Sequence, residues 1–98
     1  MTNVHSWLQN SKTNDKEKIL KALANKRRLG ILKYVKEQKQ ASVKDIAVAI
    51  NLSFKSTSRH LVILSAAGTL EKEQKSLNVF YRISKNQNPI VAYVISLL

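Results

Sequence analysis

Apolar residues recur at intervals of three or four positions through the first part of the chain, a spacing that is typical of amphipathic helices. The pattern predicts one helix over residues 15–24. It predicts a second helix that begins after Asn25, a favourable N-cap residue, and runs to residue 37. The apolar positions that define the two helices are Ile19, Leu20, Leu23, Leu29, Leu32 and Val35.

Two further helices with a short connection follow. The first begins with Ser42 as its N-cap and Asp45 as a variant of the capping box, and it stops at residue 51. Ser53 is the N-cap of the second, which covers residues 54–67 and is terminated by Gly68. A helix, a three-residue turn and a helix form the arrangement of many DNA-binding units. The positions expected to face inward are Val43, Ile46, Ala47 and Ile50 in the first helix and Thr57, Leu61 and Leu64 in the second.

The last third of the chain begins with strands. Residues 70–74 and 78–83 alternate in polarity and predict a β-hairpin closed over residues 75–77. Pro89 is favourable at the start of a last helix, which is apolar on nearly every side. The expected fold class is therefore mainly α with a small β-hairpin, a winged helix-turn-helix, in one domain of residues 1–98.

The charge of the chain indicates a polyanionic partner. There are 17 Lys and Arg residues against 6 Asp and Glu, which gives a formal net charge of +11. A surface of that charge attracts nucleic acid, and double-stranded DNA is the partner we expect. The alternative is that the basic composition reflects solubility or a lysine-rich proteome.

Several classes of protein are disfavoured by what the sequence lacks. The chain contains no cysteine, no Gly-rich phosphate loop, and only two histidines, His5 and His60. We therefore expect neither an enzyme nor a metal or other cofactor. The N-terminus has no signal-peptide pattern, and the longest apolar segment, residues 89–98, is about half the ~20 residues that span a bilayer. We expect a cytoplasmic protein with no membrane partner.

Three blocks of sequence resemble the ArsR/SmtB family of winged-helix repressors. They are LANKRRLGIL at residues 23–32, LSFKSTSRHLVILSAAG at 52–68 and VFYRI at 79–83, and the resemblance covers about residues 19–84. It implies a winged-helix fold and DNA binding by a dimer. Metal-sensing members carry a Cys-x-Cys pair where this chain has KDIA at residues 44–47. Other members place Asp and His ligands on the last helix, where residues 90–98 offer neither, so no metal response through the family sites is implied. Many relatives have a glycine in the wing turn, where Ser76 and Leu77 stand here.

The DNA-binding residues are expected mainly on the outer face of the helix at residues 54–67. The helical period places Lys55, Ser56, Ser58 and Arg59 opposite the inward positions and near the helix start, where a recognition helix meets base edges. The guanidinium of Arg59 suits guanine O6 and N7. A merely solvated helix face is the alternative.

Two neighbours of these residues each have two interpretations. Phe54 either touches a thymine methyl group or packs locally. His60 either contacts a phosphate or is partly buried and hydrogen-bonded to backbone.

Further basic residues are candidates for phosphate contacts. Lys26 and Arg27 lie with Arg28 in the first turn of a helix, where the macrodipole disfavours cations. We expect at least one of them to meet a DNA phosphate or an acidic neighbour, and we expect Arg28, which the family block shares, to be structural. In the hairpin the candidates are Lys72, Lys75 and Arg82, although Glu71 and Glu73 make a merely solvated hairpin an equal alternative.

The terminal helices, at about residues 4–12 and 88–98, are expected to form the interface of a homodimer. An apolar surface on every side of a short terminal helix exceeds what one small domain can cover. The alternative is that these residues close the core of the monomer. The residues concerned are Val4, Trp7, Leu8, Ile90, Tyr93, Val94 and Leu97.

Three functions follow from these predictions. The leading hypothesis is a sequence-specific transcription regulator that acts as a homodimer on an inverted repeat with half-sites about one helical turn apart. A repressor is the first expectation, and an activator is the alternative. The alternatives are a non-specific architectural DNA binder and a winged-helix module that binds protein.

Overall fold

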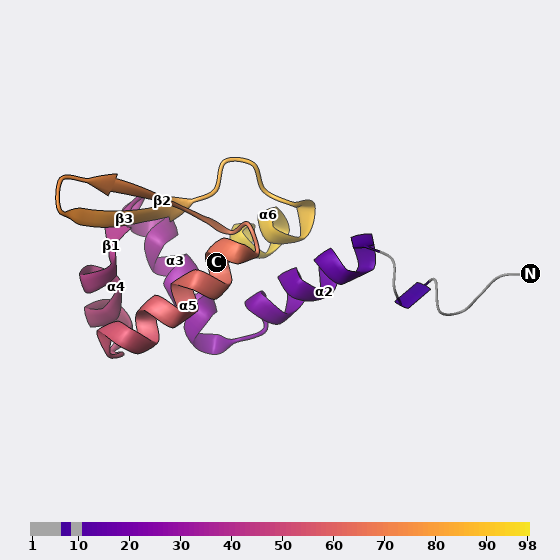
Figure 1. The fold of residues 1–98 in the computed structure, drawn as a ribbon, viewed down its shortest axis with the longest axis horizontal. Helices are drawn as coiled ribbons and strands as arrows, with labels where there is room; N and C mark the ends of the chain where they lie inside the picture. Colours follow the sequence, from indigo (N-terminus) through magenta and orange to yellow (C-terminus); the bar gives the residue numbers. More distant parts are fainter. Residues whose placement is uncertain (1–6, 9–10) are drawn as a thin grey trace, which may run out of the picture.

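A computed structural model describes residues 7–8 and 11–98 of the chain (Figure 1). The predicted fold class, mainly α with a small β-hairpin, is confirmed. The prediction missed a third short strand, and the helix predicted over residues 15–24 begins earlier, at Ser11. The elements are α2 (Ser11–Leu23), α3 (Lys26–Gln38), β1 (Ala41–Ser42), α4 (Val43–Ile50), α5 (Phe54–Ala66), β2 (Leu70–Lys75), β3 (Asn78–Ile83) and α6 (Pro89–Ser96). None of the described helices is long and apolar enough to cross a membrane.

The predicted helix ends are confirmed by their caps. The side chains of Asn25, Ser42 and Ser53 each accept a hydrogen bond from the backbone N–H three residues further on, at 3.0, 3.1 and 3.1 Å. Gly68 has a φ of 75°, in the left-handed region that glycine adopts without strain. These local bonds satisfy backbone groups that a helix end otherwise leaves free.

The core lies between the helices and one face of the sheet. α3 and α5 supply much of it, and Thr57 is fully buried on the inner face of α5, as predicted. The inward face of α4 is buried at Ile46 and Ala47, while Val43 and Ile50 are half-buried at its edge. The largest fully buried apolar side chains are Ile31, Leu32, Val35, Ile46, Leu61, Leu64 and Val91.

The sheet has three antiparallel strands in the order β1-β3-β2. β1 pairs with β3 through Ala41 opposite Tyr81, and it attaches the hairpin to the start of α4. The hairpin turn contains two residues, Ser76 and Leu77, one fewer than predicted, because Lys75 pairs with Asn78. We call β2, the turn and β3 the wing.

Candidate nucleic-acid interface

The helix-turn-helix is built by α4, a three-residue turn and α5. Asn51 ends α4 in the left-handed region at a φ of 56°, and the N–H of Leu52 donates to Ala47 O at 3.0 Å. The inner face of α5 carries the buried residues Thr57, Leu61 and Leu64. The opposite face of α5 is therefore turned outward, with its N-terminal end next to α4 (Figure 1).

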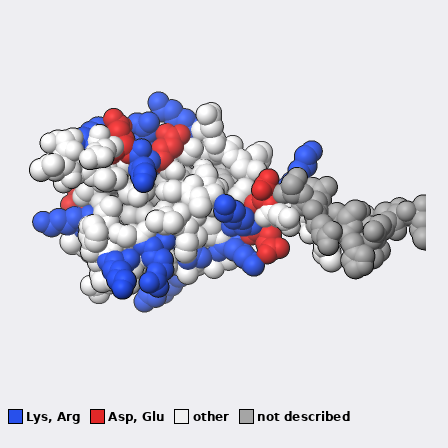
Figure 2. Space-filling view, in the orientation of Figure 1, with Lys and Arg blue, Asp and Glu red and all other residues white. Residues whose placement is uncertain are grey.

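The predicted reading residues lie on that outward face. Lys55, Ser56 and Arg59 are exposed, and Ser58 is half-buried. Phe54 is 63% exposed, so local packing covers only part of its ring. Figure 2 shows Lys and Arg side chains gathered along the lower edge of the molecule, where Figure 1 has the start of α5 and the link between α2 and α3. This face presents cations and hydroxyl groups, which suit phosphates and base edges.

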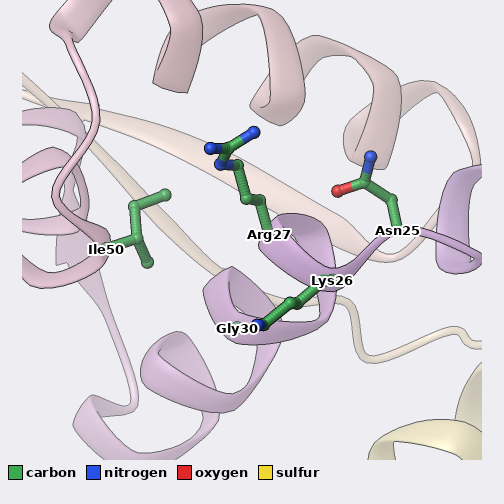
Figure 3. Close-up of a pocket in the computed structure, with 5 residues that line it drawn as sticks. All are labelled: Asn25, Lys26, Arg27, Gly30 and Ile50. Carbon is green, nitrogen blue, oxygen red and sulfur yellow. The ribbon is translucent and has the colours of Figure 1, made fainter.

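Lys26 and Arg27 extend this basic face onto α3. Both are exposed and line a pocket of about 550 Å³ with Asn25, Gly30 and Ile50, and Figure 3 shows Arg27 reaching from α3 toward α5. No carboxylate among the described residues lies within ion-pair distance of either cation. The acidic neighbour considered for them is thus not found within residues 7–8 and 11–98, and their contact with DNA phosphate stays a prediction.

Arg28 has the structural role that was predicted for it. Its Nε donates to Ala22 O at 2.6 Å, and its Nη2 donates to Lys21 O at 3.0 Å. These carbonyls belong to the last turn of α2, where the helix dipole favours a cation. Arg28 therefore joins the start of α3 to the end of α2, and the dipole of α2 offsets the unfavourable position of its charge on α3.

His60 is held by the same guanidinium. Arg28 Nη1 lies 3.3 Å from His60 Nδ1. Because a guanidinium only donates hydrogen bonds, Nδ1 accepts, and the ring proton is on Nε2. Burial, followed by the charges of Arg28, Arg27 and Arg59, lowers the pKa of His60 from its usual 6.5. Within the described residues the partner of His60 is thus a side chain on α3, and not the backbone group that was considered.

The stability of the fold should depend on pH through this histidine. Because the pKa of His60 is lower in the folded chain, the unfolded chain takes up the proton more readily. The contribution of His60 to the free energy of unfolding is therefore complete above pH 6.5, and it is lost as the pH falls toward the lowered pKa. We expect the melting temperature to fall between pH 7.5 and 5.5. In His60→Asn, whose side-chain oxygen replaces Nδ1 without titrating, the fall should be smaller. Equal falls in the two proteins, measured by circular dichroism, would contradict this role.

The cations of the wing are largely engaged within the protein. Arg82 pairs with Glu71 at 3.2 Å and with Glu73 at 3.1 Å. Lys75 Nζ donates to Gln40 Oε1 at 3.1 Å and lies 5.7 Å from the centre of the Phe80 ring. The pKa of the Glu71 carboxyl is lowered from its usual value. The first cause is the hydrogen bond that Glu71 accepts from the backbone N–H of Lys85, and the next is the hydrogen bond from Arg82.

Lys72 differs from the other two wing candidates in its side-chain contacts. It is exposed on β2, where it stands opposite Tyr81 on β3. Among the three predicted wing cations, only Lys72 has no polar partner within the described part of the chain.

The predicted dimer residues divide into two groups. Trp7, Leu8, Tyr93 and Leu97 are 65–73% exposed. Ile90 and Val94 are half-buried against the core of the monomer, in partial agreement with the alternative that the last helix closes that core. Val4, also predicted, lies outside the described residues.

α6 is attached to the domain by its other face. Val91 and Ile95 are buried in the core. Lys36 Nζ donates to Ile95 O at 2.9 Å, so a cation on α3 caps the C-terminal end of α6.

One basic residue near the interface was missed from the sequence. Lys44 is exposed in the first turn of α4 and lines a pocket shared with the wing tip and Phe54. The period of α4 could have identified it, because position 44 lies outside the inward set. Among the described residues, no three His, Asp or Glu side chains gather where a metal ion could bind.

An exposed recognition helix with its N-terminal end free, a basic surface around it and a β-hairpin beside it define a winged helix-turn-helix that binds DNA. The family model described as "Bacterial regulatory protein, arsR family" matches residues 25–72. That segment contains both helices of the helix-turn-helix, α4 and α5. The protein is therefore assigned to its class by the fold and by sequence together.

Solved structures give the same result over most of the chain. The transcriptional regulator HlyU of Vibrio vulnificus is 30% identical, with a TM-score of 0.70 over 98% of this chain and 94% of that one. The transcriptional repressor PagR of Bacillus anthracis is 27% identical, with a TM-score of 0.72 over 88% and 94%. A homodimeric winged helix-turn-helix DNA-binding domain of Mycobacterium bovis is 27% identical, with a TM-score of 0.77 over 99% and 83%.

The chain belongs to the arsR family of bacterial regulatory proteins. It is a DNA-binding transcription regulator and not an enzyme. The resemblance carried by the three sequence blocks is thereby confirmed.

Proposed function

We propose that the protein is a homodimeric repressor that binds an inverted-repeat operator in the bacterial cytoplasm. Residues 1–98 would form one winged-helix domain, and the terminal helices, at about residues 4–12 and 88–98, would form the dimer interface. With KDIA in place of the Cys-x-Cys pair at residues 44–47, repression would not respond to metals through that site.

The observation that carries the proposal is the outward face of α5. Arg59 and Lys55 lie one helical turn apart on that face, and both are exposed near the N-terminal end. Arg59 would fork to guanine O6 and N7, while Lys55 would bind guanine or a phosphate. Ser56 and Ser58 would contact base edges or backbone, and Phe54 would touch a thymine methyl group.

The remaining basic residues would hold the DNA backbone. These residues include Lys26 and Arg27 at the start of α3 and His60 in the middle of α5. Their contacts would be to phosphates. In the wing, Lys72 would be the stronger contributor. Arg82 would have to leave its two carboxylates to bind a phosphate, whereas Lys75, which donates only to the neutral Gln40, keeps its charge and further N–H donors for one.

Dimerisation is supported by the exposed side of α6. Tyr93 and Leu97, one turn apart, are 66% and 67% exposed, on the side opposite the buried Val91 and Ile95. Apolar side chains in such a row are typical of a surface that a partner covers. The Mycobacterium bovis relative is described as homodimeric and the Bacillus anthracis relative as a repressor, which agrees with both parts of the proposal.

Selection from a random duplex pool, at low and moderate salt, tests the proposal. We expect enrichment of an inverted repeat with half-sites about 10 base pairs apart, because a two-fold dimer places its recognition helices in successive major grooves. Placed between a promoter and its start site, the selected repeat should reduce transcription in vitro when the protein is added. Salt-sensitive binding without an enriched sequence would instead indicate an architectural DNA binder. An absence of binding would indicate a protein-interaction module.

A further inference from the structure

We propose that Leu77, at the tip of the wing, enters the minor groove beside each half-site as an apolar wedge that unstacks one base step and bends the DNA. The inference rests on the proposed function, because it assigns a contact to the wing of a protein bound to its operator. It gives the wing a role in indirect readout, in which the sequence is recognised by how easily it deforms.

Leu77 is placed where only a partner can cover it. It is 94% exposed, more than any other large apolar side chain within the described residues. Its turn joins β2 to β3 through only two residues, with Ser76 in the left-handed region at a φ of 58°. The turn end of the hairpin reaches past α4 at the left of Figure 1. A leucine at this end has no role in the core of the monomer.

Of the predicted wing cations, only Lys75 lies at the tip, where it donates to Gln40 and lies over Phe80. Arg82 lies near the base of the wing, opposite Glu71, and pairs with two carboxylates. Besides Leu77, the tip presents the exposed polar side chains of Ser76 and Asn78. Minor-groove proteins insert leucine and similar side chains between base steps and read A·T pairs with amide side chains.

The wing is braced well enough to act as a wedge. β3 is paired on both sides, with β2 along its length and with β1 through Phe80 opposite Ser42. The bond from Lys75 to Gln40 fixes the tip to the segment before β1. A force on the tip from the DNA would therefore be transmitted to the sheet and to the start of α4, and it would not be absorbed by a flexible loop.

A hollow between the wing and the helix-turn-helix leaves room for the DNA strand. Its volume is about 400 Å³, and it lies between Leu77 on the wing and Phe54 at the start of α5. The strand that separates the major groove from the next minor groove has to pass between these two elements. Lys44 and Ser42, which line the hollow together with Asp45, offer a charge and a hydroxyl to the phosphates of that strand.

The wedge predicts two properties of the operator complex. Selected operators should carry a TA or CA/TG step where the wing tip falls, because pyrimidine–purine steps unstack most easily. Leu77→Ser should weaken binding about tenfold, since a buried leucine side chain is replaced by a polar one. Because the wedge neutralises no phosphate, the loss should be the same at low and moderate salt.

The test uses the full-length protein and a selected operator with 2-aminopurine at that step, whose fluorescence rises on unstacking. Wild-type protein and Leu77→Met, which keeps an apolar wedge, should raise the fluorescence and bend the DNA in a circular-permutation mobility assay. Leu77→Ser should form a complex that does neither.

Three results would overturn the proposal, and they are distinguishable. A wild-type complex with unchanged fluorescence and the same bend as Leu77→Ser would remove the wedge while leaving operator binding intact. The same holds if Leu77→Ser changes the sedimentation of the free protein and not the DNA, since Leu77 would then be a protein contact. If the wild-type protein forms no sequence-selective complex, the proposed function itself fails, and the wedge fails with it.

Discussion

Replacing Tyr93 and Leu97 together by lysine is expected to make the protein monomeric and to lower its operator affinity by roughly 100-fold or more. Both side chains lie on the exposed side of α6, and across a two-fold axis the substitutions would oppose like charges in place of an apolar contact. A monomer also loses the gain that comes from binding two linked half-sites. Sedimentation velocity and fluorescence anisotropy measure the two effects.

The double variant should stay folded, because Val91 and Ile95 fill the core from the other side of α6. Val48→Lys is a control for association: it places one lysine at a 75% exposed apolar position on α4. Its sedimentation should equal that of the wild type. A double variant that remains dimeric would show that α6 is not the interface.

Arg59→Ala should weaken binding to the selected operator by roughly 30-fold or more, and should weaken binding to unrelated DNA much less. A bidentate contact between arginine and guanine contributes about 1–3 kcal/mol of discrimination, and a dimer makes the contact twice. Arg59→Lys keeps the charge without the fork, so it should recover non-specific binding but not specificity.

The comparison requires a variant that removes the same charge elsewhere. Lys85 is exposed in the segment between β3 and α6, which Figure 1 shows at the opposite end of the molecule from the start of α5. Lys85→Ala should change operator affinity little. If Arg59→Ala and Lys85→Ala lose the same small amount in anisotropy titrations, Arg59 only contributes to the overall charge.

The helix-turn-helix could be predicted from the sequence because its signals are local. The caps at Asn25, Ser42 and Ser53, the helical period and Gly68 each act within a few residues of their own position. β1 could not be predicted in this way. It has two residues and no period, and it exists because Ala41 pairs with Tyr81, which is distant in sequence.

The state of the wing shows why the candidate site was harder to predict than the fold. A three-residue turn would have set Glu71 opposite Tyr81, and the actual two-residue turn sets it opposite Arg82. A shift of one residue thus decides whether Arg82 is free or paired. The partner of His60 depended on the packing of α5 against α3, which no local pattern contains, although the family block correctly indicated that Arg28 is structural.

The hydrogen bond from Lys36 to Ile95 has a consequence for the spacing of the operator. It ties the end of α6 to α3, which also packs against both helices of the reading unit. In a dimer built on α6, this bond and the packing of α3 would help to hold the separation of the two recognition helices constant. One base pair added between half-sites turns one of them by about a tenth of a revolution around the DNA axis. The affinity of such a dimer would therefore depend on the spacing between the two half-sites as well as on their base sequence.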